Sequence, residues 1–291
     1  SMTTDALAHS RRARRSSATP AWTKGFDLAG GHAVMAVLSL FCLFPVYWMI
    51  VTSLRPANKV FERSLWPTAA SLDNYAYALN AIPIGQMLVN TLIVATLVTI
   101  VQLATGLLAA YAFARWRFPF DKLVHVLIAL TWLVPLQVVM IPNYLLIANA
   151  GLLDSLTALI LPHFASALAV LMLLQAMRSF PNEVLEAARM DGAGSWRVLW
   201  EVVTPNLRGT IASLAILIFI STWNEYFWPL LLTRTPEHSV IQIGIQMFMT
   251  SEGTQWGALM AASTLASLPI FVLYIVLQQQ VVSSFMKSGI R

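Results

Sequence analysis

The sequence contains few charged residues. Asp, Glu, Lys and Arg make up only 11% of its 291 residues, whereas 58% are hydrophobic, and the mean hydropathy is +0.69. A soluble globular domain carries about 25% charged residues. So few charges cannot cover a water-facing surface, which excludes an ordinary soluble domain. The composition fits the lipid bilayer as solvent, and helices are the default there because an open sheet cannot satisfy its backbone in lipid. We therefore predict an all-α integral membrane protein.

The sequence also lacks the patterns of several chemical sites. Its single cysteine, Cys42, excludes an intrachain disulfide and a cysteine-bound metal cluster. His32, His125 and His238 are dispersed without metal-ligand spacing. There is no G-x-x-x-x-G-K-[ST] loop and no G-x-G-x-x-G after a strand. We expect no metal, no cofactor and no catalytic residues in this chain.

Long apolar runs dominate what is present, and each is long enough to cross about 30 Å of hydrocarbon as a helix. We predict six transmembrane helices, at residues 31–53, 87–112, 124–147, 156–177, 208–232 and 258–284. Pro135 and Pro142 should kink or break the third run. The domain organisation expected is an arm at 1–30, a six-span domain at 31–284 and a tail at 285–291. Ser1 ahead of Met2 is interpreted as a cleavage remnant, and the first run as a retained span, because it is too long for a signal peptide.

The basic residues fall in short connections between the runs, which favours the membrane over nucleic acid as the reason for the net charge of +5. With alternating sides, 14 of the 18 Lys and Arg residues lie on the side of both termini, including Arg115, Arg117 and Lys122. The side richer in Lys and Arg is the cytoplasmic one. Both termini and the 178–207 connection are therefore predicted to be cytoplasmic, with membrane lipid as a partner.

The 178–207 connection contains a charged stretch between two apolar runs, EAARMDGAGSWRVLWEVVTP at 186–205. Apolar residues recur at helical spacing on both sides of Gly192-Ala193-Gly194, which predicts two short helices meeting at a sharp turn. Ser195 is expected to cap the second helix and Pro205 to end it. We name residues 180–205 the elbow. Such an elbow fits a groove on another protein, or it lies on the membrane surface as an interfacial helix pair.

The elbow resembles the signature of binding-protein-dependent ABC importer permeases. That signature is Glu-Ala-Ala, three residues, Gly, nine residues, an aliphatic residue, one residue, then Leu-Pro. The matching residues here are Glu186, Ala187, Ala188, Gly192, Val202 and Pro205, with Thr204 in place of the usual Leu. Asp191-Gly192-Ala193 matches the extended form of the carbohydrate-uptake branch, and AYAFARWRF (110–118), IPNYLLIANAGLLDSLTALIL (141–161) and WNEYFWPLLLT (223–233) resemble the maltose and glycerol-3-phosphate permeases.

The resemblance implies one permease subunit of an importer for a sugar or a sugar-like solute, glycerol-3-phosphate and glycerophosphodiesters included. The implied partners are a second permease subunit, two ATPase subunits that bind ATP and Mg²⁺, and an extracytoplasmic solute-binding protein, all at a bacterial inner membrane. The chain itself would not be an enzyme. Its implied ATPase-coupling residues are Glu186, Ala187, Ala188, Asp191, Gly192, Ala193 and Pro205.

The candidate residues of a substrate path are the polar and aromatic ones inside the apolar runs: Asn90, Gln137, Asn143, Trp223, Asn224, Glu225, Tyr226 and Trp228. An acid such as Glu225 usually faces a cavity or a partner, although an outer aromatic belt would equally explain its tryptophan neighbours. For Asn90 a helix–helix hydrogen bond is favoured, whereas Gln137 and Asn143 line a pore or repair the proline kink. His163 is expected to be a satisfied interior histidine. The alternative function is an ion-gradient-driven secondary transporter, with Glu225 at its centre.

Overall fold

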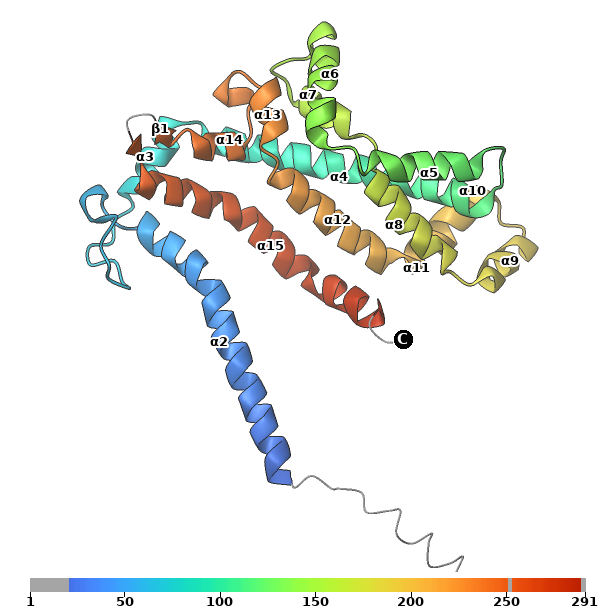
Figure 1. The fold of residues 1–291 in the computed structure, drawn as a ribbon, viewed down its shortest axis with the longest axis horizontal. Coiled ribbons are helices and arrows are strands. Elements are labelled where there is room, and N and C mark those ends of the chain that lie inside the picture. The colour runs from blue at the N-terminus through green and yellow to red at the C-terminus, as the bar shows by residue number, and fades with distance from the viewer. Residues whose placement is uncertain (1–20, 251–252, 289–291) are drawn as a thin grey trace, which may run out of the picture. The chain divides into compact units, whose positions relative to one another are not determined.

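The computed structural model describes residues 21–250 and 253–288, and the chain divides into two compact units, 1–49 and 50–291. The described residues are almost entirely helical (Figure 1). The long helices are α2 (Ala21–Ser53), α4 (Ile84–Arg115), α12 (Arg208–Trp223) and α15 (Trp256–Ser288). The intermediate ones are α3 (Asp73–Ala81), α5 (Asp121–Thr131), α6 (Leu136–Asn149), α8 (Ala167–Arg178) and α9 (Asn182–Met190).

Short elements connect these helices. They are η1 (Ala57–Lys59), α7 (Leu156–Ile160), η2 (Leu161–His163), α10 (Ser195–Arg197), the π-helical η3 (Val198–Val203), α11 (Thr204–Asn206), α13 (Phe227–Leu232), η4 (Pro236–His238) and α14 (Ile241–Gln246). The two-residue strands β1 (Met249–Thr250) and β2 (Gly253–Thr254) pair antiparallel. Of the expected arm at 1–30, residues 21–30 belong to α2, and residues 1–20, with the basic cluster Arg11–Arg15, lie outside the described part. Of the expected tail, 285–288 continue α15 and 289–291 lie outside it.

Three helices are apolar and long enough to span a membrane alone: Gly30–Ser53, Ile84–Arg115 and Trp256–Gln278. Three bent helix pairs also qualify if each counts as one span: α5 with α6 (96°), Leu156–His163 with α8 (43°), and Ser195–Asn206 with α12 (78°). Pro135 precedes α6 at the first bend, where its ring and missing N–H end a helix. Pro142, in contrast, lies inside a continuous α6.

The predicted fifth run, 208–232, is not one helix. Its first part is α12, which ends at Trp223, and a separate α13 begins at Phe227. The non-helical residues between them are the polar Asn224 and Glu225, and Tyr226. Asn224 favours the break, because Asn side chains compete with the helix for local backbone groups, and the Glu225 carboxylate accepts the Phe227 N–H at the start of α13.

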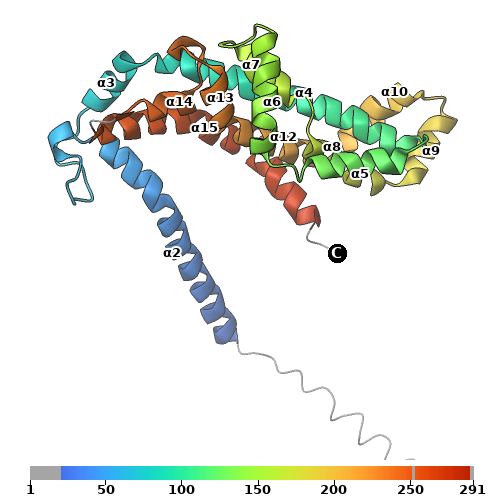
Figure 2. The same cartoon turned by 45° about the horizontal axis from the view of Figure 1, so that its top comes forward.

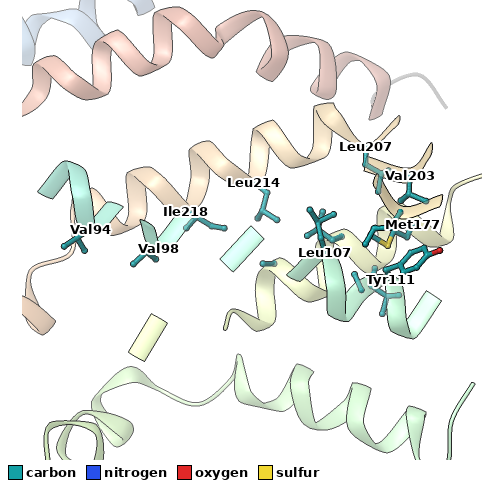
Figure 3. Close-up of a cluster of buried hydrophobic side chains, with 14 of the residues drawn as sticks. Val94, Val98, Leu107, Tyr111, Met177, Val203, Leu207, Leu214 and Ile218 are labelled. Atoms are coloured by element: carbon teal, nitrogen blue, oxygen red, sulfur yellow. The ribbon is translucent and has the colours of Figure 1, made fainter. Parts of the chain in front are cut away.

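Helix α4 is the central element of the second unit, with α8 and α12 packed along it (Figures 1 and 2). Gly106 permits the closest approach, since a Cβ there would lie 3.1 Å from the Cβ of Ala169 on α8. Figure 3 shows the larger buried cluster, which joins Val98 and Leu107 of α4 to Leu214 and Ile218 of α12. A second cluster packs Trp223 and α14 against α3 and α15.

Asp154 joins two connections that are far apart in the sequence. Its Oδ1 accepts the main-chain N–H groups of Arg234 (2.7 Å) and Thr235 (3.0 Å), and its Oδ2 accepts the Thr235 hydroxyl at 3.0 Å. Oδ2 also lies 3.1 Å from Nδ1 of His238. The Arg234 and Thr235 amides hold the pKa of the Asp154 carboxyl well below its usual range. The carboxylate therefore ties residues 151–155 to residues 233–238.

Candidate functional site

A cavity of about 550 Å³ lies where several helices break. It reaches the α5–α6 bend through Thr131 and Trp132, the η2–α8 bend through His163 and Ser166, and the end of α12 through Glu225. The full lining is Gln102, Thr131, Trp132, Val134, Leu136, Val139, Pro162, His163, Ala165, Ser166, Ala167, Leu168, Leu217, Ile218, Ser221, Thr222 and Glu225. Irregular backbone at membrane depth is tolerated only where it is buried in protein or lines a cavity, and broken helices often mark a solute site.

Polar side chains of α4 satisfy the backbone at the η2–α8 bend. Gln102 Nε2 donates to the His163 carbonyl at 2.9 Å, and the Thr105 hydroxyl donates to the Phe164 carbonyl at 2.9 Å. Ser166 then starts α8 by accepting the Ala169 N–H at 3.3 Å. A backbone carbonyl without a hydrogen bond in hydrocarbon costs on the order of several kcal/mol. Residues on α4 therefore satisfy the broken backbone at this wall of the cavity.

Glu225 both caps a helix and lines the cavity. Its Oε1 accepts the N–H groups of Phe227 (3.0 Å) and Trp228 (3.4 Å), so the carboxylate caps the start of α13. The half-buried side chain also lines the cavity, together with Ser221 and Thr222 from the last turn of α12. The acid thus faces a cavity, which is one of the two interpretations that its position in the sequence left open.

The two tryptophans beside Glu225 lie in the core. Trp223 is 1% exposed, stacks on Phe219 and donates its indole N–H to the Ala266 carbonyl at 3.2 Å. Trp228 is 2% exposed and packs edge-on against His163. Neither forms part of an exposed aromatic belt in the chain as described. Trp228 therefore supports the cavity wall at His163, whereas Trp223 belongs to the second buried cluster.

The remaining path candidates are not among the residues that line the cavity. Asn224 is exposed, and its Oδ1 accepts the Gln242 amide at 3.2 Å, while Tyr226 is half-buried. Gln137 is exposed on the first turn of α6, and Asn143 is half-buried two turns later.

Asn90 has a structural environment. It is 2% exposed, and its amide donates to the carbonyls of Glu237 (2.8 Å) and Ser239 (2.9 Å). Its Oδ1 accepts the Gln86 amide at 2.9 Å. These contacts use the whole amide and favour the structural role, in which Asn90 fastens α4 to the connection after α13.

Sequence reasoning missed the polar residues that line the cavity beside Glu225. Gln102, Thr131, Ser166, Ser221 and Thr222 are all single or paired polar residues inside apolar runs. A signal was available for Gln102, because an amide in the middle of a span needs a partner. His163 lies where an interior histidine was expected, with Nδ1 3.0 Å from the Leu159 carbonyl, and it also borders the cavity.

The elbow turns at Gly192, which has φ +78°. The N–H of Gly192 donates to the Arg189 carbonyl at 2.9 Å, and the N–H of Ala193 donates to the Ala188 carbonyl at 3.0 Å. These two bonds form a Schellman motif, which satisfies the last carbonyls of α9 and needs a left-handed residue at the glycine position. Ala188 and Ala193 both pack against the larger buried cluster.

The second arm of the elbow differs from prediction at its start and end. Gly194, not Ser195, precedes the helix, and no side chain caps it. The Ser195 carbonyl instead accepts the hydroxyl of the buried Tyr111 at 2.9 Å. Pro205 lies within α11, and the direction changes two residues later, at Leu207. Its missing N–H fits here because Thr204 and Pro205 open a new short helix beyond a π-helical turn.

The elbow has one buried face and one exposed face. Leu185, Val198, Leu199 and Val203 are buried in the cluster that Figure 3 shows around Tyr111, Met177 and Leu207. Trp196 and Trp200, counted as apolar-face residues by their spacing, are instead 65% and 41% exposed. The elbow residues Glu186, Ala187, Asp191, Gly192 and Pro205 are exposed as well. Met190, 89% exposed at the tip, adds an apolar group to that outer surface.

Comparison with known proteins places these features in a family. Residues 102–287 match the family described as "Binding-protein-dependent transport system inner membrane component". The sn-glycerol-3-phosphate transport system permease protein UgpE of Yersinia pestis bv. Antiqua is 34% identical over 267 residues, covering 88% of this chain and 95% of UgpE. The lactose transport system permease protein LacG of Rhizobium radiobacter is 27% identical over 257 residues, covering 88% of this chain and 94% of LacG.

The fold is also that of a solved transporter. A chain of a bacterial ABC transporter involved in the import of the acidic polysaccharide alginate superposes with a TM-score of 0.76 at 22% identity, covering 88% of this chain and 96% of that chain. The chain is therefore a membrane-spanning permease subunit, and it belongs to the family of binding-protein-dependent transport system inner membrane components.

Proposed function

We propose that this chain forms, with a second permease subunit, the path by which a sugar or a sugar-like solute crosses a bacterial inner membrane. Two separate ATPase subunits would bind ATP and Mg²⁺ and drive the cycle, and an extracytoplasmic binding protein would deliver the solute. The observation that carries this proposal is that the chain has both features: a polar cavity where helices break, and an elbow whose exposed turn at Gly192 is fixed by two hydrogen bonds.

In this proposal the cavity is one half of the solute path. Glu225, Gln102, Thr131, Ser221 and Thr222 would contact the solute, because hydroxyl, amide and carboxylate groups pair with sugar hydroxyls. Trp228 would support the cavity wall, and Asn90 and Trp223 would hold the surrounding helices together. Gln137, Asn143, Asn224 and Tyr226 would border the path in another conformation of the transporter or at the interface with the second permease.

The proposed cargo is a neutral sugar. The relatives are named for glycerol-3-phosphate, lactose and, in the case of AraQ of Bacillus subtilis, arabinooligosaccharides. A phosphate-bearing solute needs cationic groups, and among the described residues no Lys or Arg lines the cavity. A second permease that supplied such groups would shift the cargo toward glycerol-3-phosphate.

The elbow is the proposed ATPase-coupling element. Its contacts with an ATPase cleft would come from Glu186, Ala187, Ala188, Asp191, Gly192, Ala193 and Pro205. The buried face fastens the elbow to α4 and α8, so a push on the exposed face moves those helices as a body. The topology proposed with it has six spans, three of them bent, and both termini in the cytoplasm.

Affinity purification from the native membrane with mass spectrometry tests the assembly. A second permease, an ATPase and a solute-binding protein should co-purify, and proteoliposomes of the complex should import sugar only with ATP inside. A chain that purifies alone and moves solute on an ion gradient without ATP would establish the secondary transporter instead.

Glu225→Gln distinguishes the ATP-driven importer from the secondary transporter, because the amide oxygen can still accept the N–H groups at the start of α13 while the negative charge is lost. ATP-driven transport should fall severalfold through a raised KM, whereas an ion-coupled transporter would lose its gradient dependence entirely. Glu237→Gln is the matched control, an exposed acid outside the cavity.

A further inference from the structure

A basic pocket lies between the start of α5 and the end of α8, which pack side by side (Figures 1 and 2). One cavity of about 390 Å³ is lined by Phe113, Asp121, Lys122, His125, Val126 and Arg178. An adjoining cavity of about 380 Å³ is lined by His125, Leu171, Leu174, Gln175, Arg178 and Ser179. The two share His125 and Arg178, and we name them together the α5–α8 pocket. It is separate from the cavity at the helix breaks.

One buried nitrogen and two cationic side chains of the α5–α8 pocket lack a hydrogen-bond or ion-pair partner in the described part of the chain. Nδ1 of His125 is buried, and it has no hydrogen-bond partner in the described part of the chain. Within the same residues, the side chains of Lys122 and Arg178 form no ion pair. A buried polar atom without a partner calls for an explanation, and a ligand absent from the isolated chain is one.

The charges of the pocket favour an anion. Lys122 and Arg178 supply two cations, and Asp121 supplies one carboxylate, whose Oδ1 accepts the Lys122 main-chain N–H at 2.6 Å. One positive charge therefore remains. Arg binds phosphate oxygens through two parallel N–H groups, and Lys binds them as a point charge. A headgroup with one net negative charge balances the pocket.

The surroundings of the pocket indicate that this anion carries acyl chains. Val126 lines the pocket and is 50% exposed, and Leu123 and Leu130, one turn before and after it on α5, are 54% and 50% exposed. The three residues share one helix face. A free phosphate ion would leave this stripe bare, whereas the chains of a phospholipid would cover it.

We propose that the α5–α8 pocket binds the phosphate of an anionic phospholipid. Arg178 and Lys122 contact the phosphate oxygens, His125 donates from Nδ1, and the acyl chains lie along Leu123, Val126 and Leu130. Basic pockets between spans at the cytoplasmic surface are known sites of anionic headgroups. The proposal requires that the chain lies in a membrane with the 178–207 connection on the cytoplasmic side, and it is independent of the cargo and of ATPase coupling.

Native mass spectrometry of the full chain in non-ionic detergent tests this proposal. The probes are phosphatidylglycerol, phosphatidylcholine with the same acyl chains, and inorganic phosphate. We expect one phosphatidylglycerol to bind at least about tenfold more tightly than phosphatidylcholine. Lys122→Gln with Arg178→Gln should reduce that preference to about twofold, while Arg178→Lys should retain most of it.

The matched control is Arg63→Gln with Arg234→Gln, which removes two positive charges from exposed positions outside the pocket. It should keep the full preference. Equal loss in the pocket variant and the control would show a general charge effect and overturn the site. Undiminished preference in the pocket variant, or displacement of the lipid by millimolar inorganic phosphate alone, would overturn it as well.

Discussion

Gly192 offers a quantitative test of the elbow. The residue has φ +78°, and a Cβ added there would meet nothing within 4 Å. Gly192→Ala therefore adds no clash inside this chain, and its whole cost is the left-handed backbone, about 1–2 kcal/mol for an L-residue. That energy corresponds to a roughly 5- to 30-fold rise in the open population of the turn.

Gly194, two residues away, supplies a control in which the expected change in stability has the opposite sign. Its backbone is extended, with φ −66° and ψ 161°, and its Cβ position is also open. Gly194→Ala is therefore free of strain and should stabilise by about 0.4–1 kcal/mol through the unfolded state. The two variants add the same methyl group, so only the backbone angle distinguishes them.

Hydrogen–deuterium exchange is the assay for the turn. The amides of Gly192 and Ala193, which make the two bonds of the motif, should exchange roughly 5- to 30-fold faster in Gly192→Ala and no faster in Gly194→Ala. Equal exchange in both variants would refute the argument from backbone strain.

Comparing a small and a large side chain at position 192 then distinguishes backbone strain at the turn from contact with an ATPase subunit. Because nothing lies within 4 Å of the Cβ position, Ala and Leu share the cost of the left-handed backbone and neither clashes at Cβ. If the elbow inserts into an ATPase cleft, Gly192→Leu should lower transport and the coupled ATPase rate several-fold below Gly192→Ala. Identical rates for the two variants would argue that no partner surface lies against the turn.

Three further substitutions test contacts elsewhere. Tyr111→Phe removes only the hydroxyl that bonds the Ser195 carbonyl, so the start of the second arm should lose about 0.5–1.5 kcal/mol of protection in hydrogen exchange; unchanged exchange would contradict the contact. Gly257→Ala puts a Cβ 2.4 Å from Asn74 Oδ1 and should cost about 1–3 kcal/mol in thermal unfolding, while Gly85→Ala, where the space is open, should cost nothing. Asp154→Ala should lower thermal stability at pH 5–8. Because the pKa of Asp154 is depressed, this difference from wild type should persist above about pH 4, the ordinary aspartate range, and shrink as the carboxylate protonates at lower pH. A difference that grew on acidification would show the reverse linkage.

Recognition of the family needed only local sequence. The elbow signature and the long apolar runs are short-range patterns, because a transmembrane span is set by its own length and composition. The turn at Gly192 was predictable for the same reason, since a glycine between two amphipathic helices has a local backbone role. The break at Pro135 is equally local, because the proline ring acts on its own helix.

The site was less predictable, because it depends on which residues meet across the fold. Trp223 and Glu225 are two positions apart, yet one packs in the core against Ala266 and the other lines the cavity. The Asn90 amide donates hydrogen bonds to two carbonyls about 150 positions away, and no spacing in the sequence predicts that contact. Trp196 and Trp200 fit the α-helical apolar spacing of the second arm, but residues 198–203, Trp200 included, form the π-helical η3, in which that spacing does not apply, and both tryptophans are exposed.

The sequence by itself thus determined that this protein lies in the lipid bilayer, its helical class, its family and its turns at Pro135 and Gly192, because each depends on composition or on neighbours along the chain. Only the tertiary structure decided that Gln102 supports the η2–α8 bend and that Lys122, His125 and Arg178 share a pocket. These groups lie on different helices, and a polar residue inside an apolar run states only that it needs a partner. Helix packing determines which partner it obtains.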